Sequence, residues 1–395
     1  MCKELRRKLA RRNLRDSIRR VSLVRILLDY RPALRQRTGV GEYVHEMARG
    51  LLETSTSPDE RILLFSASWK DRLSREVLPG ASVVDRKIPV KALNYSWHRL
   101  HWPSAEQLTG ERLDVVQAFH PLMIPTRRAA QVITIHDLDF LDHPDRSRAE
   151  IRRDYPALAA DHARRAHHIV VNSRTTAQDV RKRFGVDASR ITVCYPGAPA
   201  WQPRTEEPGA PCLLFLGALE PRKNVGVLLE AYRRLLFHMP DAPPLVLAGP
   251  PGADSKTILA HASDRPLAGR VEFPGYVKDS EREALFRRAL VFIMPSHTEG
   301  FGMPVVEAMT VGVPVVVADR GALPEVVADA GLRFEPDDAE ALERLLSELI
   351  QNPARRAELR ERGWRRARAF DWKESARALR GAWQQAREVR ERADG

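Results

Sequence analysis

Short apolar runs alternate with longer amphipathic segments along most of this 395-residue chain. The short runs predict buried strands, and segments with apolar positions three or four residues apart predict helices. We predict strands at 24–28, 61–66, 83–84, 115–119, 131–135, 191–195, 213–216, 245–248, 289–294 and 313–318, with a helix end and a further strand within 163–171. We predict helices at 44–52, 175–184, 225–236, 339–350 and 372–392. Strands alternating with helices are typical of parallel sheets covered by helices, so we predict an α/β protein.

Two domains are expected from the length and from one proline-rich segment. Residues 196–211 contain five prolines and two glycines, which discourage regular structure. We predict a first domain at 23–198, a linker at 199–211 and a second domain at 212–370. A basic extension at 1–22 precedes them, and a helical segment at 371–395 follows.

The net charge of +12 is concentrated in the N-terminal extension, because residues 1–20 hold nine Lys/Arg and two Asp/Glu. This distribution argues against a nucleic-acid-binding body. Leu5, Leu9, Leu14 and Ile18 recur among the arginines, and a basic amphipathic helix of this kind can lie on an anionic membrane surface. A solvated extension, or a start codon placed too early, is the simpler explanation of the pattern.

Compartment and membrane topology follow from composition. No run approaches the ~18 apolar residues that a transmembrane helix needs, and the N-terminus lacks the apolar core of a secretory signal. Cys2, Cys194 and Cys212 are too few and too widely spaced for a disulfide framework or a metal cluster. We therefore expect a cytoplasmic protein, with peripheral contact to the inner face of the membrane through the basic extension.

The most informative stretch runs from Glu299 to Glu307. It follows the strand at 289–294, opens with Gly300-Phe301-Gly302, and enters a helix whose first turn we expect to contain Pro304 and Glu307. Loops at the carboxyl ends of parallel strands hold ligands. The pattern suggests a sugar nucleotide, with phosphates at backbone N–H groups and carboxylates at sugar hydroxyls. Alternatively, the glutamates merely suit the helix dipole.

Three further segments contain candidate residues. Arg222 and Lys223 are adjacent cations at a strand–helix junction after Gly217, which suits a diphosphate, although a solvated basic turn remains the alternative. His136 ends a buried strand. The loop with Gly39 and Gly41 lies between a strand and a helix and can cradle phosphate, although it lacks the full dinucleotide fingerprint.

These residues together resemble a known family. E-G-F-G-M-P-V-V-E-A-M, with glutamates eight apart, followed by G-V-P-V-V and G-A-L-P-E, is similar to the donor-site signature of retaining family-4 glycosyltransferases of the GT-B fold. The resemblance implies two Rossmann-like domains facing across a cleft, with the C-terminal helix crossing back to the first. It implies that Glu299 contacts the donor sugar and that Glu307 holds the ribose hydroxyls.

Other segments resemble the same family. T-G-V-G-E-Y resembles its first-domain loop, H-D-L its element with a histidine beside the sugar, and V-E-F-P-G-Y-V its base-contacting element ending at Val277. Many members have arginine where this chain has Ala218, so Arg222 would supply that contact. The implied catalytic residues are His136, Arg222, Lys223 and Glu299. The implied donor-binding residues are Gly39, Gly41, Gly217, Val277, Gly300, Phe301, Gly302, Met303 and Glu307.

The resemblance implies retaining transfer of a hexose from a nucleotide-diphosphate sugar to a saccharide or lipid-linked acceptor, in cell-surface glycan synthesis. No metal or other cofactor is expected. H-D-L-D-F-L and L-E-P-R-K-N resemble mannosyltransferase-type members, which favours GDP-mannose over a UDP-sugar. The alternatives are a sugar-nucleotide epimerase or phosphorylase of the same fold, or a non-catalytic nucleotide-sugar-binding protein.

Overall fold

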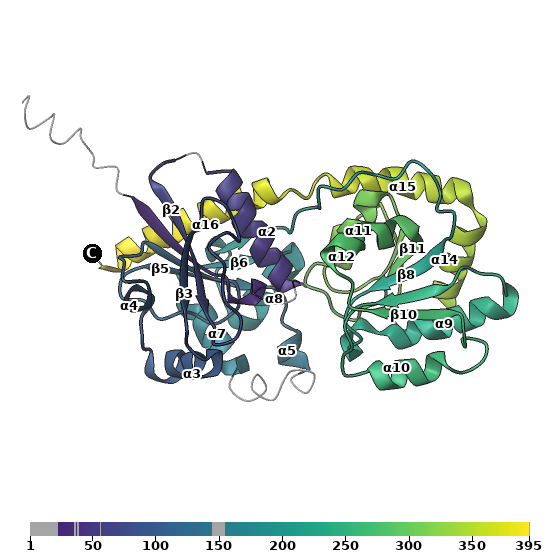
Figure 1. Ribbon diagram of the computed structural model, residues 1–395, viewed down its shortest axis with the longest axis horizontal. Coiled ribbons are helices and arrows are strands. Elements are labelled where there is room, and N and C mark those ends of the chain that lie inside the picture. The colour runs from purple at the N-terminus through teal and green to yellow at the C-terminus, as the bar shows by residue number, and fades with distance from the viewer. Residues whose placement is uncertain (1–22, 35–36, 38, 56, 144–154, 395) are drawn as a thin grey trace, which may run out of the picture. The chain divides into compact units, whose positions relative to one another are not determined.

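The computed structural model describes residues 23–34, 37, 39–55, 57–143 and 155–394 (Figure 1). The amphipathic helix that we predict within residues 1–20 lies outside this part of the chain. The chain divides into two compact units. The first comprises the chain up to Thr134, Ala166–His168 and the C-terminal part from Arg380, and the second comprises Ile135–Arg165 and Ile169–Leu379.

A seven-stranded sheet begins in the first unit and has the order β3-β2-β1-β4-β5-β6-β7. Its strands are β1 (Val24–Asp29), β2 (Glu60–Ala67), β3 (Ser82–Arg86), β4 (Val115–Ala118), β5 (Ala130–Ile135), β6 (His168–Val171) and β7 (Ile191–Val193). The associated helices are η1 (Arg31–Ala33), α2 (Val40–Glu53), α3 (Val90–Leu100), α4 (Ala105–Thr109), α5 (Asp139–Asp142), α7 (Tyr155–Arg165), α8 (Arg174–Phe184) and η3 (Ala188–Arg190). The recorded pairings β1–β2, β1–β4, β2–β3, β4–β5 and β6–β7 are all parallel. The order reverses between β1 and β4, where open parallel sheets bind their ligands.

A six-stranded parallel sheet forms the core of the second unit, with the order β10-β9-β8-β11-β12-β13. Its strands are β8 (Cys212–Leu216), β9 (Leu245–Ala248), β10 (Val271–Gly275), β11 (Ala289–Met294), β12 (Val315–Ala318) and β13 (Leu332–Phe334). Every residue of β8, β9, β11 and β12 is buried, as expected for strands covered on both faces. The order reverses between β8 and β11, which locates the second ligand-binding edge.

Helices cover both faces of this second sheet (Figure 1). They are η4 (Pro221–Lys223), α9 (Val225–His238), α10 (Ser255–Ala262), α11 (Asp279–Arg288), α12 (Met303–Val311), α13 (Leu323–Val327), α14 (Ala339–Gln351) and α15 (Pro353–Ala367). In Figure 1, α11, α12 and α15 lie above the sheet, and α9 and α10 lie below it. Helix α9 packs against α14, and α12 packs against α15. Two sheets with helices on their faces confirm the predicted pair of Rossmann-like domains.

The last helix, α16 (Trp372–Asp394), crosses back to the first unit, as the family resemblance implied. Arg380 donates through Nε to both carboxylate oxygens of Glu60 at 3.1 and 2.9 Å, and through its NH1 to Thr54 Oγ1 at 2.6 Å. Trp383 Nε1 donates to Gln117 Oε1 at 3.1 Å. The C-terminal part of α16 is therefore an integral element of the first unit.

The proline-rich segment contains no helix or strand, but it is closely packed. Arg204 is 7% exposed, and its backbone N–H donates to the Val311 carbonyl at 2.9 Å. A Cβ at Gly197 would lie 2.4 Å from the Trp372 backbone nitrogen, so only glycine fits there. None of the helices in the described part of the chain is both long and apolar enough to cross a membrane.

Candidate functional site

Glu299 stands in the loop after β11, at the edge where the strand order of the second sheet reverses. Its side chain is 9% exposed. Its carbonyl accepts from the Ala322 N–H at 2.9 Å, and a Cβ at Gly321, whose φ is +58°, would lie 2.6 Å from that carbonyl oxygen. Glycine at position 321 therefore allows two backbone segments to meet and hold the carboxylate in place.

Lys223 reaches Glu299 from the neighbouring strand. It ends η4, the short turn after β8, and its Nζ contacts Glu299 Oε1 in an ion pair in which both residues are buried. Ser296 Oγ donates to the same Oε1 at 2.8 Å, and Arg222 places its NH1 3.6 Å from Oε2. The His297 N–H also donates to the Arg222 carbonyl at 2.9 Å, so backbone and side chains both join the two loops. The structure therefore brings together three of the four predicted catalytic residues.

Charge within this cluster keeps Glu299 and Arg222 ionised, whereas burial lowers the pKa of Lys223 by more than the charge of Glu299 raises it. Burial raises the pKa of Glu299, but the charges of Lys223 and Arg222 and the hydrogen bonds outweigh burial and hold the pKa below its usual range. Burial lowers the pKa of Arg222, but the charges of Glu299 and Asp137 raise it more. Glu299 and Arg222 are thus ionised at neutral pH and fixed before a ligand arrives, as electrostatic catalysis requires.

His136, the fourth predicted catalytic residue, follows β5 and adjoins the glycine-rich turn. A Cβ at Gly300 would lie 1.8 Å from the His136 carbonyl oxygen and 3.3 Å from Asn172 Nδ2. Thr176 Oγ1 donates to the same carbonyl at 3.3 Å. Glycine at position 300 is therefore required by the approach of the protein backbone, whereas we had expected it to admit a ligand.

The remainder of the turn anchors helix α12. Gly302 has φ of +95° and begins the helix, with Pro304 in the first turn as predicted. Phe301 is 3% exposed, and its ring centroid lies 5.3 Å from that of Phe370 and 6.1 Å from that of Tyr195. The Phe301 side chain is thus part of the core, which leaves its backbone to face a ligand. Met303, the first helical residue, is half-buried.

Glu307 lies beyond the first turn of α12, so our placement of this residue in the first turn is wrong. It is 7% exposed, and one NH2 group of Arg282 donates to both its carboxylate oxygens, at 2.7 and 2.8 Å. Burial raises the pKa of Glu307 above its usual range, and Arg282 offsets this only in part. Arg282 was not identified from the sequence, because α11 shows many charged residues and no motif there marks this one.

Glu325, at the end of the G-A-L-P-E motif, caps helix α8. Its carboxylate accepts from the N–H groups of Arg174 and Thr175 at 2.9 and 3.0 Å, and from the Tyr195 hydroxyl at 2.6 Å. Burial raises the pKa of Glu325, but these hydrogen bonds lower the pKa by more than burial raises it, so the carboxylate is held ionised. A carboxylate at a helix N-terminus is stabilised by the free N–H groups there.

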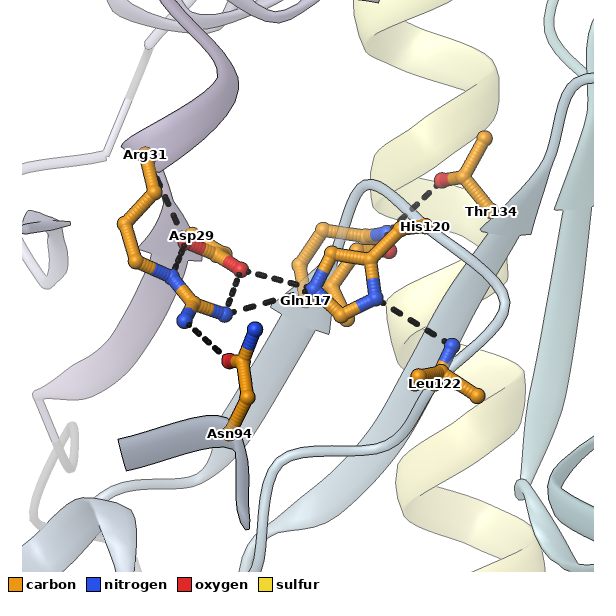
Figure 2. A network of polar contacts seen from close by, with 8 residues as sticks. Asp29, Arg31, Asn94, Gln117, His120, Leu122 and Thr134 are labelled. Carbon is orange, nitrogen blue, oxygen red and sulfur yellow. Dashed lines mark hydrogen bonds and ion pairs between the residues drawn. The ribbon is translucent and has the colours of Figure 1, made fainter. Parts of the chain in front are cut away.

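The first unit has its own polar cluster where its strand order reverses (Figure 2). Asp29, at the end of β1, is fully buried, and it accepts from Arg31 Nε and NH2 at 2.8 and 2.7 Å and from His120 Nε2 at 2.9 Å. Burial raises its pKa, but Arg31 and His120 hold the pKa below its usual range. Arg31 NH1 donates to Asn94 of α3 at 2.9 Å. We had not predicted this cluster.

The other predicted donor-binding residues occupy varied positions. Gly39 and Gly41 belong to the first unit, where Gly39, with φ of +51°, precedes α2. We had expected Gly41 in the loop before the helix. The helix begins at Val40, so Gly41 lies in its first turn. A Cβ at Gly41 would lie 2.7 Å from the Pro32 carbonyl oxygen. Val277, in the second unit, is half-buried against the core.

Gly217 follows β8 and completes the second unit's edge. A Cβ at this position would lie 3.0 Å from the Phe215 ring and 3.6 Å from Lys223 Cε. Gly249, with φ of +137°, packs so closely that its own Cβ would lie 2.1 Å from the Gly217 carbonyl oxygen. These glycines allow the loops after β8 and β9 to pack directly under Lys223.

Comparison with protein families assigns the chain. The model for glycosyl transferases group 1 matches residues 200–366, which include Arg222, Lys223, Glu299 and Glu307. The model for glycosyltransferase family 4 matches residues 37–200, which include His136. The chain belongs to the family-4 glycosyltransferases. The resemblance drawn from the sequence motifs is thereby confirmed.

Among curated members of this glycosyltransferase family, the chain is similar to the O-antigen chain mannosyltransferase B of Escherichia coli. The two are 26% identical over 376 residues, covering 88% of this chain and 96% of the relative. Among solved structures, sucrose-phosphate synthase from Thermosynechococcus elongatus matches with a TM-score of 0.75 and 18% identity, covering 92% of this chain and 98% of that one. The Anabaena protein HepE, solved with UDP and glucose, matches with a TM-score of 0.65 and 17% identity over 91% of this chain and 98% of that one. The structural matches confirm the GT-B fold.

Proposed function

We propose that this glycosyltransferase moves a hexose from a nucleotide-diphosphate sugar to a saccharide or lipid-linked saccharide, with retention of the anomeric configuration. The observation that carries the proposal is the buried cluster of Lys223, Arg222 and Glu299 where the strand order of the second sheet reverses. Fixed cations beside a carboxylate suit a ligand that combines a diphosphate with a sugar.

In this proposal, Lys223 and Arg222 stabilise the diphosphate as it departs. Negative charge develops on the bridging oxygen when the C1–O bond breaks, and cations already in place stabilise it without rearrangement. The free N–H groups at the start of α12 add partial positive charge at the same loop. No metal ion is required for this role.

Glu299 has two tasks in the proposed complex. Its Oε1 is occupied by Lys223 and Ser296, whereas its Oε2 lies 3.6 Å from Arg222. We assign Oε2 as the acceptor for a donor-sugar hydroxyl, while Oε1 keeps the lysine in position. An ionised carboxylate suits this role, because it can only accept hydrogen bonds.

Glu307 is assigned to the ribose hydroxyls of the nucleotide. Arg282 fixes the carboxylate from one side through a single nitrogen shared between the two oxygens. Each carboxylate oxygen has a second lone pair, which a vicinal diol can satisfy. Arg282 is thus proposed as a positioning residue for nucleotide binding.

The proposed reaction exchanges two bonds at one carbon. An acceptor hydroxyl attacks C1 on the face from which the diphosphate leaves, and its proton passes to the departing phosphate oxygen. We propose that His136 lies beside the transferred sugar. We assign the backbones of Gly39, Gly41, Gly217, Gly300, Phe301, Gly302 and Met303 to the donor, and that of Val277 to the base.

GDP-mannose is the favoured donor, on the basis of the H-D-L-D-F-L and L-E-P-R-K-N motifs and the similarity to an O-antigen mannosyltransferase. A cytoplasmic location with peripheral membrane contact through residues 1–22 belongs to the same proposal. It suits an acceptor carried on a lipid in cell-surface glycan synthesis.

The proposal is tested by supplying GDP-mannose, UDP-glucose or UDP-galactose with and without saccharide and lipid-linked acceptors. We expect nucleoside diphosphate release that depends on both donor and acceptor, and an NMR coupling in the product that matches the donor anomer. Lys223→Ala lowers release at least ~10-fold, whereas Lys256→Ala, at an exposed lysine of α10, serves as the matched control. Conversion of the donor without acceptor, an inverted product, or a tightly bound nucleotide without turnover would each refute the proposal.

A further inference from the structure

Large apolar side chains are exposed around helix α3 of the first unit. The exposed fractions are 67% for Tyr95, 63% for Leu100 and 59% for Trp102. Trp69, which follows β2, is also 59% exposed, and Lys87 lies over its ring at 4.9 Å from the centroid. Large apolar side chains exposed on one helix and its flanking segments mark a candidate interaction site. We call the set the α3 surface, made of Trp69, Lys87, Lys91, Tyr95, Leu100 and Trp102.

The segment that contains α3 is basic, between Asp85 and Glu106. Residues 86–105 contain four Lys/Arg and no Asp or Glu. Lys91, Tyr95 and Arg99 are four residues apart along α3 and so share one face of the helix. Basic and aromatic groups thus stand together without an interspersed acid in this segment, which favours a partner with repeated negative charge.

Contacts within the first unit hold α3 and the turn after it in place. Trp97 is 1% exposed, and its Nε1 donates to the Pro103 carbonyl at 2.9 Å. Ser96 Oγ donates to the Trp102 carbonyl. On the inner side, Arg31 lies over the Trp97 ring at 4.7 Å and donates to Asn94, so α3 is joined to the buried Asp29 cluster (Figure 2). Trp102 is therefore presented to solvent by a fixed turn.

We propose that the α3 surface docks this protein on an anionic lipid membrane. Tryptophan and tyrosine favour the boundary between headgroups and acyl chains, and Leu100 adds apolar surface that a saccharide partner would not use. Each Lys or Arg near an anionic membrane contributes roughly 1 kcal/mol of attraction. The surface is separate from the basic extension at residues 1–22, and the proposal does not depend on the identity of the donor.

The position of the surface fits this role. Trp69 and Lys87 follow the carboxyl ends of β2 and β3. These strands are parallel, so both ends lie at the edge of the sheet where ligands bind. Docking through the α3 surface thus brings the membrane to the ligand-binding edge of the first unit.

The decisive experiment uses the full chain and vesicles whose acyl chains carry bromine, which quenches nearby tryptophan. Residues 1–22 contain no tryptophan, so quenching reports on the folded body and not on the extension. We expect quenching with vesicles of phosphatidylcholine and 30% phosphatidylglycerol, and little with phosphatidylcholine alone. Trp69→Phe with Trp102→Phe removes most of the quenching, whereas Trp364→Phe does not. Binding without quenching, or quenching that survives the double replacement, overturns the proposal.

A second arm measures vesicle affinity by cosedimentation. Tyr95→Ser, Leu100→Ser and Trp102→Ser together lower the partition coefficient at least ~10-fold, since each removes apolar surface from the interface. Lys87→Glu with Lys91→Glu lowers it at least ~5-fold per position, because each replacement removes an attraction and adds a repulsion. Lys256→Glu with Leu259→Ser, on exposed residues of α10, is the matched control. Equal binding of the α3 variants and this control, or no vesicle binding by the parent protein, also overturns the proposal.

Discussion

Removal of Lys223 tests whether the buried ion pair serves catalysis or only the fold. Lys223→Met leaves the Glu299 carboxylate 9% exposed, with Arg222 3.6 Å away and the Ser296 hydroxyl at 2.8 Å. Removing one partner of a buried pair costs about 3–5 kcal/mol. Because Arg222 and Ser296 remain, we expect the lower end, about 3 kcal/mol in the second unit.

Turnover should fall for a different reason. The ammonium group supplies a charge-assisted hydrogen bond worth about 1.5–3 kcal/mol. If that bond is formed to the departing diphosphate, its loss slows turnover about 10- to 150-fold, since each 1.36 kcal/mol corresponds to tenfold. A double variant, Lys223→Met with Glu299→Gln, removes both charges and separates the two effects.

The assay combines chemical denaturation with nucleoside diphosphate release. We expect the double variant to regain most of the stability lost in Lys223→Met, because the buried carboxylate is no longer left without its lysine, while its turnover stays at least ~10-fold low. Arg288→Met is the control, because the Arg288–Glu272 pair is solvent-exposed and such pairs contribute about 0–1 kcal/mol. A double variant that recovers turnover together with stability would show that the pair is structural only.

Three further perturbations probe other parts of the chain. Gly300→Ala forces a Cβ to 1.8 Å from the His136 carbonyl oxygen and should lower the free energy of unfolding by about 3 kcal/mol or more in denaturation. The control Gly226→Ala, whose Cβ meets nothing within 4 Å, should be neutral or stabilising. Equal effects of the two replacements would contradict the packing argument. Glu307→Gln should weaken nucleotide affinity at least ~10-fold by calorimetry, and unchanged affinity would reject the ribose assignment. Folding raises the pKa of Glu307 above 4.5, so this carboxyl makes the free energy of unfolding fall as pH rises from 4.5 through the folded-state pKa. Glu307→Gln should remove this pH dependence when unfolding is measured against pH. If the pH dependence persists, another group causes it. Asp29→Asn should destabilise the first unit by about 3–5 kcal/mol without altering the nucleotide affinity of the second unit. Loss of both stability and nucleotide affinity would show that the Asp29 cluster also serves nucleotide binding.

Much of the fold was predictable because hydrophobic patterns report burial directly. The runs at 245–248 and 289–294 have the same bounds as β9 and β11, since strands covered on both faces are continuously apolar. Helix α15 was missed, because its sequence is dominated by arginine and glutamate and its few apolar positions give a weak pattern. Helix α3 was missed because aromatic and polar residues are mixed along it.

The candidate site was predictable where a motif names its members, and not where partners come from distant segments. Lys223 and Glu299 were predicted individually, but no sequence spacing states that they meet, because 76 positions separate them and adjacent strands bring them together. The contact of Asp29 with His120 was missed for the same reason, because 91 positions separate the two residues. Gly300 shows a further limit, since a glycine required by a neighbouring carbonyl and a glycine required by a ligand look identical in a sequence.

The return of α16 to the first unit has a consequence for synthesis on the ribosome. Arg380 and Trp383, which bond to Glu60 and Gln117, follow Ile169–Leu379 of the second unit in the chain and are translated after it. The first unit therefore waits for translation of the second unit before Gln117 acquires its indole partner, although most of its own strands emerge first. A nascent chain stalled before Arg380 would present this unit incomplete to chaperones and proteases.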